Sequence, residues 1–296
     1  MKALHNFFRS TLLILFLLGC SNSPKMPLDK LIKVETHKLH IYCTGEGNPT
    51  VVIDTGITDT YEGWLPLIGQ ISQETRVCAY ERAGYGQSEP GPLPRDSNRA
   101  EEELDSLLKK AGIKPQYLLI GHSLGGLNMQ VFADKYPTQV AGAILFDPPP
   151  LDWLIGNSFP ELHQAFSQQA GVFQSMAEAA RKDPNPEASK QADFLEMVAS
   201  EYSGLTGQSA QQAASIVSFG DLPLVVMGST KPNPNFGESA QDFQQFWLQQ
   251  SEALAAKSTR GTFIRAEGSS HYIHIDHPQL VLDTIHEMVM QIRQDQ

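Results

Sequence analysis

The sequence predicts an α/β fold in which a mostly parallel sheet is covered by helices. One observation is the run Tyr-Leu-Leu-Ile at residues 117–120, which is short, wholly apolar and typical of a buried parallel strand. A second is the segment after it, where apolar side chains recur at helical spacing up to Pro137. A third is the helix expected after Pro278, whose apolar positions 281, 285, 288, 289 and 292 share one face.

The other elements follow from the same kinds of pattern. Further strands are expected at residues 39–43, 50–53, 76–80, 142–146 and 262–267. The segment between residues 151 and 221 is rich in Gln, Ala and Ser and predicts helices at 159–181, 187–202 and 210–218. An Asp-Pro-Asn-Pro break at 183–186 should separate the first two of these helices.

Between the strand at 117–120 and its helix lies Gly121-His122-Ser123-Leu124-Gly125-Gly126. A Gly-x-Ser-x-Gly sequence in a strand-to-helix turn is typical of a nucleophile elbow. Such a serine occupies a sharp, strained turn, and a side chain two residues before or after it would collide with the neighbouring strand or helix. Ser123 is therefore the candidate nucleophile.

A serine hydroxyl needs a base, usually a histidine that a carboxylate orients. His271 lies in a loop of small residues after the strand at 262–267 and before the helix at Pro278, and we expect it to be the base. His274, between two isoleucines, is expected to be packed in the interior. His277, directly before Pro278, is expected to be a capping or surface residue.

These motifs together resemble the alpha/beta-hydrolase fold superfamily, in its serine hydrolase form. Residues 81–88, Glu-Arg-Ala-Gly-Tyr-Gly-Gln-Ser, resemble the turn after the family's fourth strand, and residues 222–228 look like its seventh strand. The resemblance implies an eight-stranded, mostly parallel sheet with helices on both faces, and no cofactor or metal. It also implies a core at 31–150 and 222–296, with a helical cap at 151–221 inserted after the sixth strand.

The resemblance leaves the position of the triad acid open. Most members place it after the seventh strand, but the loop at 228–238 contains no Asp and only Glu238 at its end. A second arrangement places it after the sixth strand, where Asp147 ends the run at 142–146. We favour Asp147, with Glu238 as the alternative and Asp242 as a third possibility. The resemblance further implies an oxyanion hole formed by the backbone N–H groups of Leu124 and Ile57.

The N-terminus has the pattern of an export signal. Lys2 and Arg9 precede an apolar run at residues 12–18 that is too short to span a bilayer. Leu-Leu-Gly-Cys at 17–20 resembles the lipobox of bacterial lipoproteins, which implies a signal peptide at 1–19, lipid attachment to Cys20 and a tether at 20–30. Ser21 resembles outer-membrane sorting, so we expect an envelope protein facing the periplasm. An ordinary secretory signal is the alternative.

Charge narrows the classes of partner. The chain has a net charge of −11, and removing residues 1–19 with their two basic side chains gives −11 − 2 = −13. This argues against nucleic acid and against a polybasic contact with anionic lipid, so the membrane contact would be the lipid at Cys20. The sequence indicates no protein partner.

Two cysteines remain after Cys20 and would lie in an oxidising compartment. In the family's strand order the second and fourth strands are neighbours, so a Cys43–Cys78 disulfide is geometrically possible. Two buried free thiols are the alternative.

The expected function is hydrolysis of a small ester-like substrate through an acyl-enzyme. A cofactor-free haloperoxidase-like or carbon–carbon bond hydrolase has the same triad and stays an alternative. A ligand-binding lipoprotein that kept the fold without catalysis is another.

Overall fold

The computed structural model of the protein describes residues 26–296. The predicted signal peptide, Cys20 and residues 21–25 of the predicted tether lie outside the described residues. The first strand begins at Leu28, so the core starts 31 − 28 = 3 residues earlier than the predicted boundary at residue 31. Within residues 26–296, no helix combines the length and the apolar character that crossing a membrane requires.

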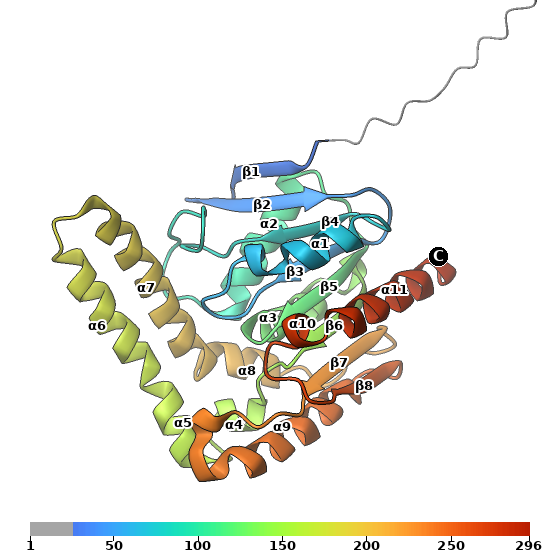
Figure 1. Cartoon of the computed structure of the whole chain (residues 1–296). Coiled ribbons are helices and arrows are strands. Elements are labelled where there is room, and N and C mark those ends of the chain that lie inside the picture. Colours follow the sequence, from blue (N-terminus) through green and yellow to red (C-terminus); the bar gives the residue numbers. More distant parts are fainter. Residues whose placement is uncertain (1–25) are drawn as a thin grey trace, which may run out of the picture.

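One sheet of eight strands, in the order β1-β2-β4-β3-β5-β6-β7-β8, forms the centre of the molecule (Figure 1). The pairs β1–β2 and β2–β4 are antiparallel and the other pairs are parallel, which confirms the predicted mostly parallel eight-stranded sheet. The strands are β1 (Leu28–Lys33), β2 (Lys38–Thr44), β3 (Thr50–Asp54), β4 (Val77–Tyr80), β5 (Tyr117–His122), β6 (Val140–Phe146), β7 (Leu224–Ser229) and β8 (Gly261–Ala266). Strands β3 to β6 are almost wholly buried, as their apolar sequences require.

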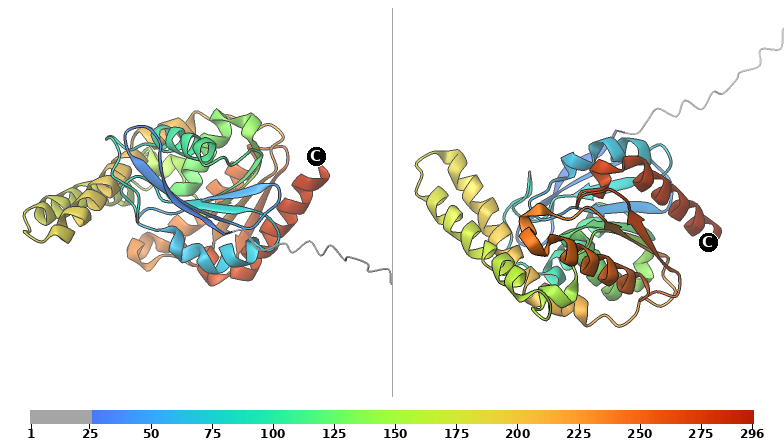
Figure 2. Two further views of the ribbon diagram at one scale, coloured as in Figure 1. Left: turned by 90° about the horizontal axis from the view of Figure 1, so that it is seen from above. Right: turned by 60° about the horizontal axis from the view of Figure 1, so that its bottom comes forward.

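Helices cover both faces of the sheet (Figure 2). One face packs against α1 (Leu65–Ile71) and α11 (Pro278–Gln294), whose apolar side chains join one buried cluster with alternate strand residues. The other face packs against α2 (Ser97–Lys110), α3 (Leu124–Lys135) and α9 (Ala240–Ala255). Shorter elements connect them: η1 (Tyr61–Trp64), η2 (Pro137–Gln139), η3 (Pro234–Ser239) and α10 (Ile273–Asp276).

Five helices occupy the segment between β6 and β7. They are α4 (Leu151–Leu154), α5 (Pro160–Ser167), α6 (Gln169–Arg181), α7 (Pro186–Leu205) and α8 (Gln208–Ala214). The helix predicted at 159–181 is interrupted at Gln168, and the helix predicted at 210–218 ends at Ala214, where the Ser215 hydroxyl donates to the Gln212 carbonyl. The predicted break at 183–186 is present, and α6 and α7 form a hairpin that extends from the body as an arm (Figures 1 and 2).

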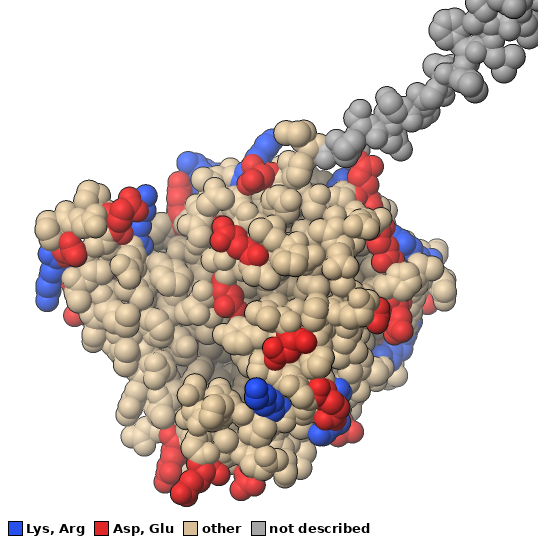
Figure 3. All heavy atoms as spheres, in the orientation of Figure 1, with Lys and Arg blue, Asp and Glu red and all other residues tan. Residues whose placement is uncertain are grey.

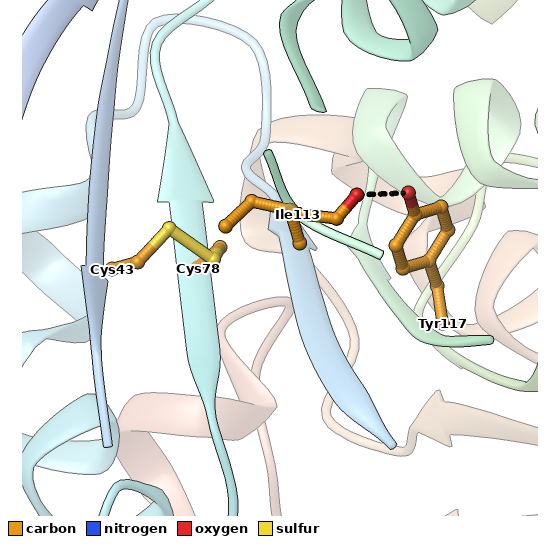
Figure 4. The surroundings of a disulfide bond; sticks show 4 residues. All are labelled: Cys43, Cys78, Ile113 and Tyr117. Atoms are coloured by element: carbon orange, nitrogen blue, oxygen red, sulfur yellow. Dashed lines mark hydrogen bonds between the residues drawn. A yellow bond between two sulfur atoms is a disulfide. The ribbon is translucent and has the colours of Figure 1, made fainter. Parts of the chain in front are cut away.

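A disulfide joins β2 to β4 near the edge of the sheet. Cys43 and Cys78 are paired directly opposite each other in the antiparallel register, and their sulfur atoms are bonded (Figure 4). The bridge closes a 35-residue separation that contains β3 and α1. In the chain-entropy model such a bridge stabilises the fold by about 3 to 4 kcal/mol. Beside it, the Tyr117 hydroxyl donates to the Ile113 carbonyl at 3.0 Å.

Candidate active site

Ser123 lies in the turn between β5 and α3 with a strained backbone, at φ 53° and ψ −118°. A Cβ atom on Gly121 would lie 2.4 Å from the Gly125 carbonyl oxygen. A Cβ atom on Gly125 would lie 2.2 Å from the carbonyl oxygen of Asp54 at the end of β3. Both positions therefore need glycine, because neither clash is with a side chain that could move aside.

Asp147 and His271 form a short hydrogen bond at the same edge of the sheet. The distance between His271 Nδ1 and Asp147 Oδ2 is 2.6 Å. Asp147 directly follows β6 and its side chain is only 3% exposed, whereas that of His271 is 31% exposed. An ionised carboxylate can only accept, so Nδ1 carries the proton and Nε2 keeps a lone pair that can accept a proton from a nucleophile.

The other side of the Asp147 carboxylate contacts the end of β7. The Ser229 N–H donates to Asp147 Oδ1 and the Ser229 hydroxyl donates to Asp147 Oδ2, both at 2.9 Å. The Gln244 side chain on α9 donates in turn to the Ser229 carbonyl at 2.7 Å. Three hydrogen bonds thus satisfy a buried carboxylate and fix its orientation. Sequence reasoning missed Ser229 and Gln244, since neither belongs to a local motif.

The alternative candidates for the acid and the base do not take part in this hydrogen bond. Glu238 is exposed in η3 and Asp242 is exposed in the first turn of α9. His277 occupies the N-cap position of α11. His274 is 5% exposed, and its ring stacks on Trp64 at a centroid distance of 4.2 Å. The structure therefore brings Asp147, and neither of the other carboxylates, to His271.

Ser123, His271 and Asp147 line one pocket of about 460 Å³. Ile57, whose N–H is a predicted oxyanion donor, lines it too, and Leu124 opens α3, so its N–H has no partner within the helix. No hydrogen bond joins Ser123 to His271 among the described residues, which is common for such pairs in the absence of a ligand. The remaining wall is mainly apolar and aromatic and includes Trp153, Leu162, Phe166, Tyr202, Leu205, Phe236 and Trp247.

Polar residues line the pocket as well. Those from the loop after β7 are Lys231, Asn233 and Asn235, and Gln169 comes from the cap. On the face drawn in Figure 3, the surface between the α6–α7 arm and the core carries few charged side chains. In the part of the chain that the structure describes, no group of three or more His, Cys, Asp or Glu residues is arranged to hold a metal ion.

A second layer of histidines supports the loop that carries His271. His122 Nε2 lies 3.0 Å from the His271 carbonyl and must donate to it, so His122 fixes the backbone of His271. Its Nδ1 faces Asp59 Oδ2 at 3.5 Å, and burial lowers the pKa of His122. Burial also lowers the pKa of His274 from 6.5 to about 3, with a further decrease from the neighbouring His122. Both rings therefore stay neutral near pH 7.

The chain belongs to the alpha/beta hydrolase family, because the family model matches residues 51–284. It is 28% identical over 247 residues to YqjL of Bacillus subtilis, an uncharacterized protein, and the match covers 82% of this chain and 85% of that one.

Solved structures show the same fold. An esterase from Thermogutta terrifontis matches with a TM-score of 0.65 at 18% identity, covering 90% of this chain and 99% of that one. The Cif epoxide hydrolase from Acinetobacter nosocomialis matches with a TM-score of 0.68 at 17% identity, covering 89% of each chain.

We predict that His274 makes the folded state sensitive to acid. Its pKa is about 3 when folded and returns to its ordinary 6.5 on unfolding, so this stability is complete above pH 6.5 and is lost as the pH falls towards 3. Between pH 7 and pH 5 the wild type should lose about 2 kcal/mol more unfolding free energy than His274→Phe, which keeps the stacking on Trp64. Urea unfolding at both pH values measures this. Equal losses in the two proteins would show that His274 titrates normally.

Proposed function

We propose that the protein is a serine hydrolase that cleaves carboxylic esters through an acyl-enzyme, with Ser123 as nucleophile, His271 as base and Asp147 as the orienting acid. The observation that carries the proposal is the His271–Asp147 hydrogen bond in the pocket that Ser123 also lines. A protein that only binds a ligand has no need of a strained serine, a histidine in its Nδ1–H tautomer and a buried carboxylate together.

In the first half-reaction, Ser123 Oγ attacks the substrate carbonyl carbon while its proton passes to His271 Nε2. Asp147 stabilises the resulting imidazolium, and the Ile57 and Leu124 N–H groups donate to the oxyanion. The tetrahedral intermediate then collapses. The bond from carbon to the leaving oxygen breaks, His271 returns the proton to that oxygen, and the acyl group remains on Ser123.

In the second half-reaction, water takes the place of the leaving alcohol. His271 accepts a proton from the water while the water oxygen attacks the acyl carbon. The bond from this carbon to Ser123 Oγ then breaks, His271 returns the proton to Oγ, and the acid leaves. The pocket supports a substrate of modest size with an apolar portion, because Trp153, Phe166 and Tyr202 from the cap and Trp247 from α9 line it.

We predict that Ser123→Ala abolishes both fluorophosphonate labelling and hydrolysis of p-nitrophenyl esters, with a decrease in kcat of about 10⁶-fold. The fold should be unchanged, because the substitution removes one oxygen from an intact turn. Ser175→Ala, on the exposed face of α6, is the matched control and should label and turn over normally.

A screen of acyl lengths with the wild type then identifies the preferred ester. Labelling of Ser123 without hydrolysis of any ester would favour the carbon–carbon bond or haloperoxidase-like chemistry. Absence of labelling in a folded wild-type protein would refute the nucleophile assignment.

We also propose that residues 1–19 are a lipoprotein signal and that Cys20 carries the lipid that anchors the enzyme to the bacterial envelope, at the periplasmic face of the outer membrane. The lipobox-like Leu-Leu-Gly-Cys sequence supports this. We predict that Cys20→Ala loses metabolic labelling with a clickable fatty acid and leaves the membrane fraction or stays uncleaved, whereas Ser21→Ala keeps the label. Equal labelling of the wild type and Cys20→Ala would show that the lipid is not on this residue.

A further inference from the structure

The loop after β3, which carries Ile57, is held by a buried arginine. Arg82, just after β4, donates to the Thr55 carbonyl at 2.8 Å and to the Gly56 carbonyl at 2.9 Å. The same guanidinium pairs with the carboxylate of Asp54 at 2.5 Å. With a side chain that is only 2% exposed, Arg82 thus contacts three consecutive residues, namely Asp54 at the end of β3 and the first two residues of the loop.

A tyrosine from the same turn holds the next part of the loop. The Tyr85 hydroxyl accepts from the N–H of Thr58 at 3.2 Å. Thr58 has a positive φ of 66°, a conformation that a β-branched residue adopts only when its surroundings impose it. Arg82 therefore holds residues 54–56 and Tyr85 holds residue 58, so Ile57 lies between residues that are hydrogen-bonded or ion-paired.

Arg82 and Tyr85 both donate hydrogen bonds to one carboxylate from the cap. Glu201 on α7 accepts from Arg82 Nε at 2.8 Å and from the Tyr85 hydroxyl at 2.5 Å. It is 6% exposed and therefore depends on these partners. Burial alone would lower the pKa of Arg82, but Glu201 and Asp54 raise it well above its usual value, so the guanidinium stays charged.

We propose that Glu201 is a positioning residue, which acts through Arg82 and Tyr85 to hold residues 54–58 in the conformation that presents the Ile57 N–H to the oxyanion. The inference rests on the proposed function, since it assigns this N–H to the oxyanion hole. Tyr202, which lines the pocket, follows Glu201 directly, so one turn of α7 both lines the pocket and contacts the two side chains that hold the loop.

Glu201 is not the sole contact that holds α7 and α8 against the core. The Ser200 hydroxyl accepts from the Arg95 N–H at 2.8 Å, and the Ser209 hydroxyl on α8 accepts from the Ser97 N–H at 3.0 Å. Removing the charge of Glu201 therefore leaves these contacts between cap and core in place.

We predict that Glu201→Gln lowers kcat for a p-nitrophenyl ester by about 10²-fold, the effect of one misplaced oxyanion donor, with KM nearly unchanged. The inhibition constant of a boronic acid, whose adduct on Ser123 resembles the tetrahedral intermediate, should increase by a similar factor. A purely structural role would lower the unfolding free energy without this parallel change in kcat and boronate affinity.

Two control variants distinguish an effect on the position of the Ile57 loop from an effect on the stability of the fold. Glu196→Gln removes a partly exposed carboxylate from the same helix, where it pairs with Arg181. Glu103→Gln removes a carboxylate that is 5% exposed and pairs with Arg95 without contacting the loop, so it should lower stability and keep kcat. If Glu201→Gln does not fold, Tyr85→Phe removes one hydroxyl of the same network and should give a smaller parallel loss.

Unchanged kcat and boronate affinity in folded Glu201→Gln, or in Tyr85→Phe if the first variant does not fold, would overturn the inference. A loss of kcat in Glu103→Gln as large as in Glu201→Gln would also overturn it, because the effect would then follow stability. Failure of the wild type to react with fluorophosphonate refutes the proposed function itself and is distinguishable from both outcomes.

Discussion

The hydrogen bond from His271 to Asp147 connects three neighbouring strand ends. Asp147 follows β6, Ser229 ends β7 and holds the carboxylate from its other side, and His271 follows β8. Parallel strands deliver their carboxyl ends to one edge of the sheet, so residues far apart in sequence meet without further machinery. A buried carboxylate is stable there only because each of its oxygens is hydrogen-bonded.

The need to hydrogen-bond a buried charged group also explains the contacts around Arg82. Arg82 is almost fully enclosed, and a single carboxylate would satisfy only part of its guanidinium. Asp54 from the core and Glu201 from the cap supply two carboxylates, and the loop carbonyls accept the remaining N–H groups. Polar contacts beside the loop that carries Ile57 therefore join α7 to the core, whereas the rest of the α6–α7 hairpin extends away from the body (Figure 1).

Local patterns predicted those parts of the fold and site that depend on adjacent residues. The strand-turn-helix context located Ser123, and the apolar periodicity after Pro278 located α11. The structure also places Asp147, rather than Glu238, against His271. Ser229, Gln244 and Glu201 could not be predicted, because their roles come from tertiary neighbours 82, 15 and 119 residues away along the chain. The interruption at Gln168 was missed because the helical pattern continues through it.

A comparison of kcat/KM between Asp147→Asn and Glu238→Gln on one activated ester tests whether the triad acid lies at the end of β6. The asparagine cannot hold the useful tautomer of His271, so Asp147→Asn should lose activity by about 10⁴-fold. Glu238→Gln, an exposed change, should stay near wild type, with circular dichroism confirming that both variants are folded. A large loss in Glu238→Gln with near-normal Asp147→Asn would contradict this account of the site.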